Sequence, residues 1–146
     1  MRQINGRSIL RIARKFNAEI AASSGHILLI GATGTGKTTI LENLLKSYPA
    51  AYHDFQTQLP QPGELEAGRV FASSPVAVVD YIDFDHATAR PLIDLLRTCR
   101  KDGCRLIVST MHMPNIEALS QFSKVFELVR EAPGKGVKMI VPGQLQ

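Results

Sequence analysis

One stretch constrains this chain more than any other: Gly31-Ala32-Thr33-Gly34-Thr35-Gly36-Lys37-Thr38 fits the pattern G-x-x-x-x-G-K-[ST] at every fixed position. An apolar run at 27–30 precedes it, and a helical pattern at 39–46 follows it. A strand, a glycine-rich loop and a helix N-terminus together form a phosphate cradle, because backbone N–H groups converge there and the helix dipole favours negative charge. The sequence therefore predicts a triphosphate site on this loop.

The loop also carries two side chains whose chemistry suits a triphosphate. Lys37 is expected to reach the β- and γ-phosphates, and the Thr38 hydroxyl is expected to ligate Mg²⁺. ATP and Mg²⁺ are the expected ligands. The other positions expected to contact the nucleotide along this stretch are Gly31, Ala32, Thr33, Gly34, Thr35, Gly36 and Thr39.

A second acid is needed to hold Mg²⁺, directly or through water, and Asp80 is the natural candidate. Four apolar residues at 76–79 precede it. They place Asp80 at the carboxyl end of a buried strand, the edge at which open α/β sheets bind ligands. The catalytic base is less defined. Tyr81 cannot serve as a carboxylate base, whereas Asp83 and Asp85 either polarise a water or cap the next helix.

Polar residues also end the next buried strand, at 105–110. Ser109 or Thr110 is expected to sense the γ-phosphate there, and His112 to report it to a neighbouring subunit. A polar turn without such a role is the alternative interpretation. The other histidines lack metal-ligand spacing and are assigned no role; they are His26, His53 and His86.

Helical and strand patterns alternate along the chain. Helices are predicted at 8–22, at 37–47, from about 87 to 99 and from 114 to about 122, and strands at 26–30, 50–56, 75–80, 105–110, 124–130 and 137–141. Ser8 is the expected N-cap of the first helix. A loop is predicted at 57–74, with a short helical piece near 64–67, and a turn at 133–136.

This alternation predicts an α/β fold with a parallel sheet and right-handed crossovers. A single domain is expected from the length of 146 residues. Its parts are an N-terminal amphipathic helix at 1–24, a nucleotide-binding core at 25–130, and a terminal hairpin and tail at 131–146.

Composition bears on location and redox chemistry. No apolar run approaches the roughly 20 residues that span a bilayer, and the N-terminus lacks the apolar core of a secretory signal. Cys99 and Cys104 are not spaced as a metal or redox pair. We expect a cytoplasmic protein without a transmembrane segment, and a peripheral position at the inner face of a membrane stays open.

The formal net charge of +4 is mild, but the positive residues are clustered. Each cluster is expected either to contact nucleic acid, acidic lipid or a neighbouring subunit, or to be a solvated helix face. The first cluster is Arg2, Arg7, Arg11, Arg14 and Lys15; the second is Arg97, Arg100, Lys101 and Arg105.

From about residue 25 to 122 the chain resembles the RecA-like (ASCE) P-loop NTPases. Among them it most resembles the traffic ATPases of type II and type IV secretion and pilus retraction. The matching stretches are 31–39 and Val-Ser-Thr-Met-His-Met-Pro-Asn at 108–115, which is similar to their histidine box. Asp54 stands where their acidic box lies.

The resemblance implies a three-layer P-loop NTPase fold with a mainly parallel sheet of about five strands and a C-terminal hairpin. If the strand at 50–56 forms, the Asp80 strand is third in the chain, which leaves room for a strand between it and the phosphate-loop strand, as in RecA-like NTPases. The resemblance also implies a Mg²⁺-dependent ATPase in which Lys37, Asp80 and Asp83 are catalytic. The implied assembly is a homo-oligomer or a partnership with a larger motor or secretion complex.

Departures from the pattern of those ATPases keep other activities open. The chain reads Asp80-Tyr81-Ile82-Asp83 where those ATPases show Gly-Glu-x-Arg-Asp, and their inter-subunit arginines have no clear counterpart. DNA-translocating ring motors are the second resemblance. A nucleotide-binding switch or accessory subunit with little hydrolysis is the alternative to a motor. A small-molecule kinase is less favoured because residues 110–123 contain no arginine for a lid, and a GTPase because no Asn-Lys-x-Asp tetrapeptide occurs.

Overall fold

The computed structural model describes residues 6–32, 34–48, 50–54, 76–84, 90, 93–94, 96–97, 105–131 and 136–141. Its helices are α1 (Gly6–Ala22), α2 (Lys37–Ser47) and α5 (Ile116–Leu119), and helical residues also occur at 90, 93–94 and 96–97. Its strands are β1 (Ile27–Gly31), β2 (Ala51–Asp54), β3 (Val76–Ile82), β4 (Arg105–Thr110), β5 (Lys124–Arg130) and β6 (Val137–Ile140).

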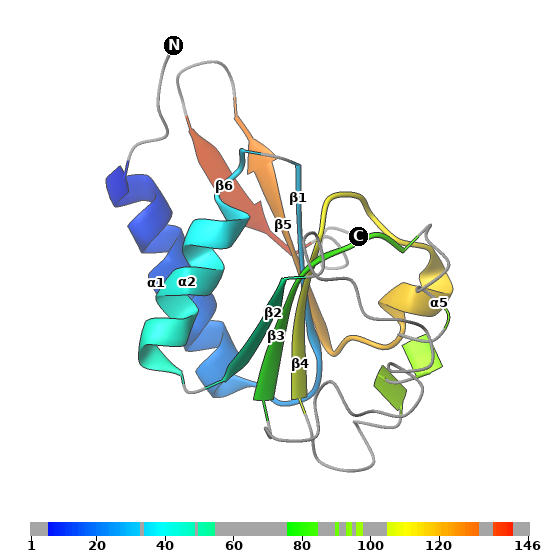
Figure 1. The fold of residues 1–146 in the computed structure, drawn as a ribbon. Coiled ribbons are helices and arrows are strands. Elements are labelled where there is room, and N and C mark those ends of the chain that lie inside the picture. Colours follow the sequence, from blue (N-terminus) through cyan, green and yellow to red (C-terminus); the bar gives the residue numbers. More distant parts are fainter. Residues whose placement is uncertain are drawn as a thin grey trace.

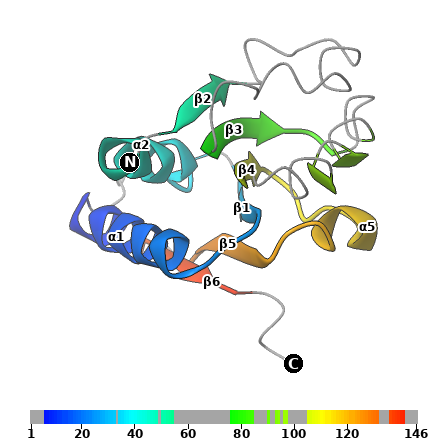
Figure 2. The same ribbon diagram turned by 90° about the horizontal axis from the view of Figure 1, so that it is seen from below.

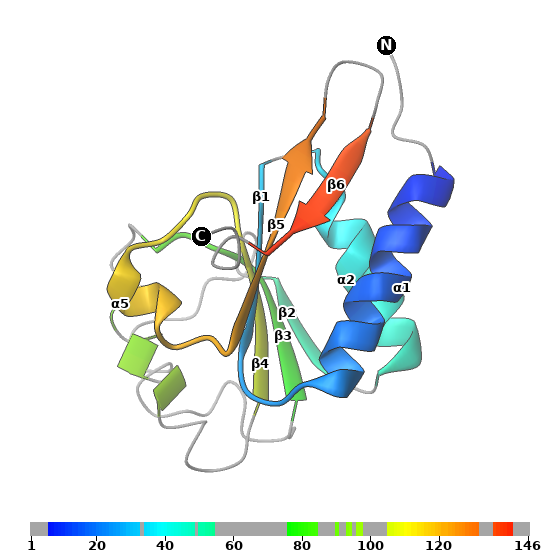
Figure 3. The same cartoon turned by 180° about the vertical axis from the view of Figure 1, so that it is seen from behind.

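The six strands form one sheet in the order β2-β3-β4-β1-β5-β6. All neighbours are parallel except β5 and β6, which form the expected antiparallel hairpin. Helices α1 and α2 cover one face of the sheet, and α5 lies on the other (Figures 1 and 3). The predicted three-layer α/β fold is confirmed, and β4 is the strand between β1 and β3.

Two apolar cores form because β1 is buried on both faces. Leu28 and Ile30 pack with residues of β3 and β4 and with Leu96, whereas Ile27 and Leu29 pack with α1 and α2. Helices α1 and α2 lie side by side over that second face (Figure 2). Phe16 of α1 meets Phe126 of β5 edge-on, with ring centroids 5.6 Å apart. The apolar stripe of α1 therefore attaches this helix to the sheet.

Two predicted helix boundaries are wrong. Ser8 lies inside α1 (Gly6–Ala22) and is not its N-cap. The helix expected from 114 to about 122 is only α5, and its N-cap is Asn115, whose side-chain Oδ1 accepts the Ala118 N–H at 3.0 Å. The N–H groups of Gln121 and Phe122 then bond to carbonyls three residues earlier. This tighter winding ends the helix before β5 begins.

Several predictions lie outside the described residues. They are the loop at 57–74 with its helical piece near 64–67, most of the helix from 87 to 99, residues 133–135 of the turn, and Asp85. Within the described part of the chain, no helix combines the length and apolar character needed to cross a bilayer.

Two polar side chains make hydrogen bonds at the end of the sheet where β1 and β4 begin. The buried His26 accepts the Leu106 N–H at Nδ1 (3.0 Å), and its Nε2 lies 2.6 Å from the Leu96 carbonyl oxygen, to which it donates in this tautomer. The half-buried Arg105 donates to Ile20 O (2.8 Å) and Gly25 O (2.7 Å) at the end of α1. Arg105 therefore satisfies carbonyl groups at the end of α1. Although it belongs to the second basic cluster, its guanidinium is engaged within the fold.

Candidate nucleotide site

The glycine-rich loop joins β1 to α2 at the edge where the parallel strands end (Figure 1). Gly36 is the N-cap of α2 and has φ 99°, a left-handed conformation. The positive φ favours glycine here, and a Cβ would also lie 2.8 Å from Ile9 Cδ1, so the end of the Ile9 side chain would have to move. Thr35 Oγ1 donates to Ala32 O at 2.7 Å and closes the turn, whereas Thr33 lies outside the described residues.

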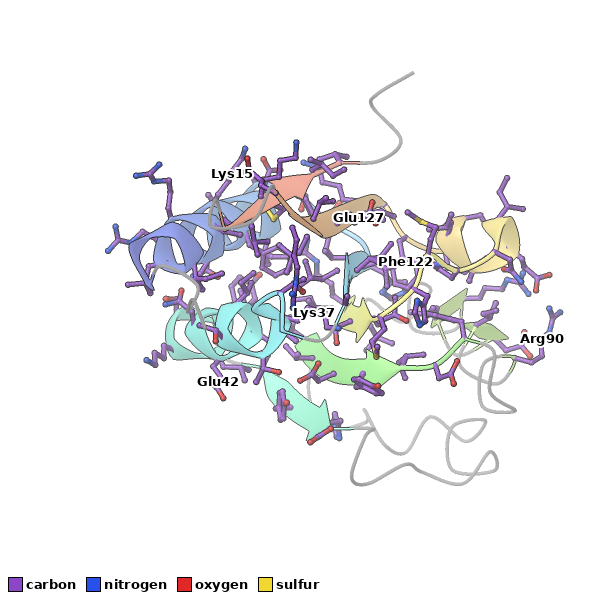
Figure 4. All side chains as sticks on the ribbon, turned by 90° about the horizontal axis from the view of Figure 1, so that it is seen from above. Lys15, Lys37, Glu42, Arg90, Phe122 and Glu127 are labelled. Atoms are coloured by element: carbon purple, nitrogen blue, oxygen red, sulfur yellow. The ribbon has the colours of Figure 1, made fainter. Side chains whose placement is uncertain are left out.

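Lys37 is the first residue of α2 and is only 7% exposed. Its Nζ donates to the carbonyl oxygen of Gly31, at the start of the loop. Burial lowers the pKa of Lys37, and the negative charge of Asp80 opposes this shift. Seen from the loop side, Lys37 lies between α2 and the sheet, whereas Glu42 of the same helix points outward (Figure 4). The structure thus places a desolvated cation beside the loop.

Asp80 lies in β3, is 6% exposed and accepts two hydrogen bonds. Ser109 Oγ of β4 donates to Oδ1 at 2.5 Å, and Tyr52 Oη of β2 donates to Oδ2 at 2.8 Å. Burial, and then the bond to Asp80, raises the pKa of Tyr52, so its hydroxyl stays a donor further into the alkaline range than a free phenol does. The two neighbouring strands therefore fix the carboxylate from both sides.

A β-bulge interrupts β3 at Asp80. Val79 pairs with Val108 and Ile82 with Thr110, so two β3 residues face the single Ser109 of β4. The second of these residues, Tyr81, has φ 72° and is the one non-glycine with positive φ in the described chain. Such a conformation costs about 1–3 kcal/mol and persists only where the surroundings enforce it. The Tyr81 ring centroid lies 5.8 Å from Lys37 Nζ.

The remaining predicted residues are placed as follows. Thr38 and Thr39 lie in the first turn of α2 and are exposed. Thr110 Oγ1 donates to Ile82 O at 2.7 Å, so its hydroxyl joins β4 to β3. His112 and Asp83 are exposed beyond the ends of β4 and β3. The structure brings together Lys37, Asp80 and Ser109, and the two exposed residues lie outside this buried group.

Sequence reasoning missed three residues of this region. Tyr52 donates to Asp80, and the ring of Tyr81 faces Lys37. Arg130 ends β5, and its Nη2 would lie 2.7 Å from a Cβ placed on Gly34, so its guanidinium lies against the loop. The position of Arg130 could have been predicted, because it stands at the end of a predicted strand and the loop lies at the carboxyl ends of the parallel strands. The contacts of the two tyrosines depend on strand pairing, which the sequence does not state.

The sheet order and the loop between β1 and α2 define a P-loop NTPase fold. No protein-family model and no curated protein matches the chain. Solved structures with a similar fold include the Thermotoga maritima RuvB Holliday junction branch migration motor, with TM-score 0.59 and 17% identity over 88% of this chain and 47% of that one. The Legionella pneumophila ATPase DotB has TM-score 0.58 and 12% identity over 97% and 52%.

A DNA replication initiation factor is a third similar structure, with TM-score 0.53 and 14% identity over 85% of this chain and 47% of that one. The chain therefore spans about half the length of the solved structures it matches. At these identities the likeness concerns the fold.

Proposed function

We propose that this chain binds ATP with Mg²⁺ on the loop at 31–38, hydrolyses it, and powers or regulates secretion, conjugation or DNA translocation. The observation that carries the proposal is that Lys37 and Asp80 are both buried beside a glycine-rich loop, with the negative charge of Asp80 acting on the Lys37 ammonium. Burying two ionisable side chains costs desolvation free energy, and such groups are concentrated at functional sites. The motor class is supported by solved structures with this fold, which include a branch migration motor and an ATPase.

The donor set suits Mg²⁺ that arrives with a nucleotide. Among the described residues, no group of three or more His, Cys, Asp and Glu gathers to hold a metal. Nucleotide-bound Mg²⁺ usually takes only one or two protein side chains and completes its shell with phosphates and water. Thr38 and Asp80 supply a hydroxyl and a carboxylate, and Asp80 keeps acceptor capacity beyond its two hydrogen bonds. The ion itself neutralises charge that develops on the phosphates.

In this proposal Lys37 leaves the Gly31 carbonyl and binds the β- and γ-phosphates, while the loop N–H groups hold the phosphate oxygens. Asp80 and Thr38 hold Mg²⁺. Asp83 orients the attacking water, and Thr110 and His112 respond to the γ-phosphate. The exposed position of Asp83 and His112 suits residues that meet water or a neighbouring subunit.

The proposed setting is a cytoplasmic homo-oligomer or a larger motor assembly. The outer side of α1 carries Arg11, Arg14 and Lys15, all exposed (Lys15 is labelled in Figure 4). A positive helix face of this kind suits nucleic acid or acidic lipid. We place the contact with such a partner there.

A second candidate is a switch that binds ATP with little hydrolysis. The observation in its favour is Tyr81, which follows Asp80 and offers no carboxylate to activate water. In this case the bound nucleotide, and not its turnover, changes the partner interaction.

Phosphate release by the purified protein with ATP and Mg²⁺ separates these functions. The assay is run alone, with duplex DNA and with small-molecule acceptors, using Lys37→Ala and the exposed Lys46→Ala of the same helix as a matched pair. Release that requires Lys37 and tolerates Lys46→Ala supports the ATPase, and stimulation by DNA supports translocation. Tight binding without release supports the switch. Acceptor phosphorylation, or equal nucleotide affinity in wild type and Lys37→Ala, contradicts the proposal.

A further inference from the structure

The β-bulge at Asp80 changes where two neighbouring side chains lie. Successive residues of a regular strand point to opposite faces of the sheet. Here Asp80 and Tyr81 share the single partner Ser109, and both approach Lys37. The ring centroid of Tyr81 is 5.8 Å from Lys37 Nζ, within cation–π range, and the carboxylate of Asp80 acts on the same ammonium. Bulges next to binding sites commonly redirect side chains in this way.

Ser109 holds the redirected residues in place. Its Oγ accepts the Tyr81 N–H at 2.8 Å, which supplies a partner for a backbone donor in the bulge. The same oxygen donates to Asp80 Oδ1 at 2.5 Å. One buried hydroxyl therefore couples the conformation of Tyr81 to the position of the carboxylate.

The phenol of Tyr81 has a weak partner. Its Oη donates to the thioether Sδ of Met111, just beyond the end of β4. Thioether sulfur is a poor acceptor, whereas a hydrogen bond to a phosphate oxygen is charge-assisted and about twice as strong as a neutral one. The hydroxyl is thus able to exchange sulfur for an anionic oxygen at a gain in free energy.

From this geometry, and resting on the function proposed above, we propose that Tyr81 contacts the terminal phosphate of a bound nucleoside triphosphate and gives the site its preference for triphosphate over diphosphate. The Tyr81 ring faces Lys37 Nζ while this group is bonded to Gly31 O, at the start of the loop, so the ring lies beside the loop that would receive the phosphates. The strained backbone of Tyr81 is retained because it delivers the phenol to this place.

Calorimetric titration with Mg²⁺-AMP-PNP and Mg²⁺-ADP tests the contact. Tyr81→Phe keeps the ring and removes only the hydroxyl. We expect it to weaken AMP-PNP binding about tenfold, the usual effect of losing one hydrogen bond to a charged group, and to leave ADP affinity within about twofold. Tyr48→Phe, at the end of α2, is the matched control and keeps both affinities. Equal losses for the two nucleotides, or no loss, would overturn the inference.

A second variant separates contact from packing. Glycine adopts φ 72° without strain, so Tyr81→Gly keeps the backbone of the bulge while removing the ring. We expect a folded protein in which the AMP-PNP to ADP affinity ratio falls at least as far as in Tyr81→Phe. A lower melting temperature with an unchanged ratio would assign Tyr81 a packing role and contradict the contact.

The two proposals fail in different ways. If wild-type protein binds neither nucleotide, the nucleotide site and the Tyr81 contact are both wrong. If wild type binds both, Lys37→Ala binds neither and the Tyr81 variants keep the wild-type ratio, only the Tyr81 contact is wrong.

Discussion

Tyr52 donates a 2.8 Å hydrogen bond from its phenol to Oδ2 of Asp80, across the pairing of β2 with β3. The donor is 40% exposed, whereas the acceptor is 6% exposed. A side chain at the rim of the sheet thus stabilises a carboxylate in its interior.

Removing this donor is expected to destabilise the fold. Tyr52→Phe leaves one oxygen of the buried Asp80 without its phenol partner, and the expected loss is about 1–2 kcal/mol in the free energy of unfolding. Urea denaturation at pH 7 measures this loss, and Tyr48→Phe is the control. A midpoint equal to that of wild type would show that water replaces the phenol at no cost.

The same bond predicts a dependence on alkaline pH. Burial, together with the bond to Asp80, raises the pKa of Tyr52 above its ordinary value of about 10. Between about pH 10 and the raised pKa, the unfolded state loses the phenolic proton while the folded state keeps it, so stability falls as pH rises. Urea titrations from pH 8 to pH 11 should show a steeper loss for wild type than for Tyr52→Phe. Parallel curves would contradict the raised pKa.

Gly36→Ala is expected to damage both stability and nucleotide binding. The new Cβ would meet Ile9 Cδ1 at 2.8 Å and would sit on a backbone with φ 99°. The left-handed conformation alone costs about 1–2 kcal/mol for a residue with a Cβ. The double variant Gly36→Ala/Ile9→Ala relieves the clash and not the backbone strain. A double-mutant cycle in urea should therefore show a favourable coupling between the two substitutions, and strict additivity would speak against the contact.

His26 and His112 form a matched pair with opposite expectations. His26→Ala removes the acceptor of the buried Leu106 N–H and the partner of the Leu96 carbonyl, at an expected cost of about 2–4 kcal/mol. His112 is exposed, so His112→Ala should change stability by less than about 0.5 kcal/mol. Thermal melting of the two variants measures both. A mild effect of His26→Ala would mean that water enters and satisfies these groups.

The regular parts of the fold were predictable because local signals agree there. The bounds of α2 match the prediction because Gly36 precedes the helical pattern and Pro49 follows it. The strands β4 and β5 also match, since both are short apolar runs bounded by turn residues. The apolar run at 76–79 correctly predicted a buried strand leading to Asp80, but β3 continues through the bulge to Ile82 and does not end at Asp80.

The interactions around Asp80 were not predictable in the same way. The bulge arises where two β3 residues meet one β4 residue, and Ser109 and Tyr81 are 28 positions apart. Tyr52 and Asp80 are also 28 positions apart in the sequence, so no local sequence pattern predicts their hydrogen bond. The short α5 shows the reverse case, in which Pro114 suggested a helix start but the Asn115 cap sets the first helical residue at Ile116, two residues later.

Helix α1 lies against the phosphate loop, although it contributes no residue to that loop. The Ile9 side chain occupies the space that a Cβ on Gly36 would fill, and Ile9 lies in the first turns of a helix attached through Phe16 to the sheet. The phosphate loop is therefore bordered by α1, the helix beside α2 on the same face of the sheet. A displacement of α1 is expected to reach the N-terminus of α2 through Ile9.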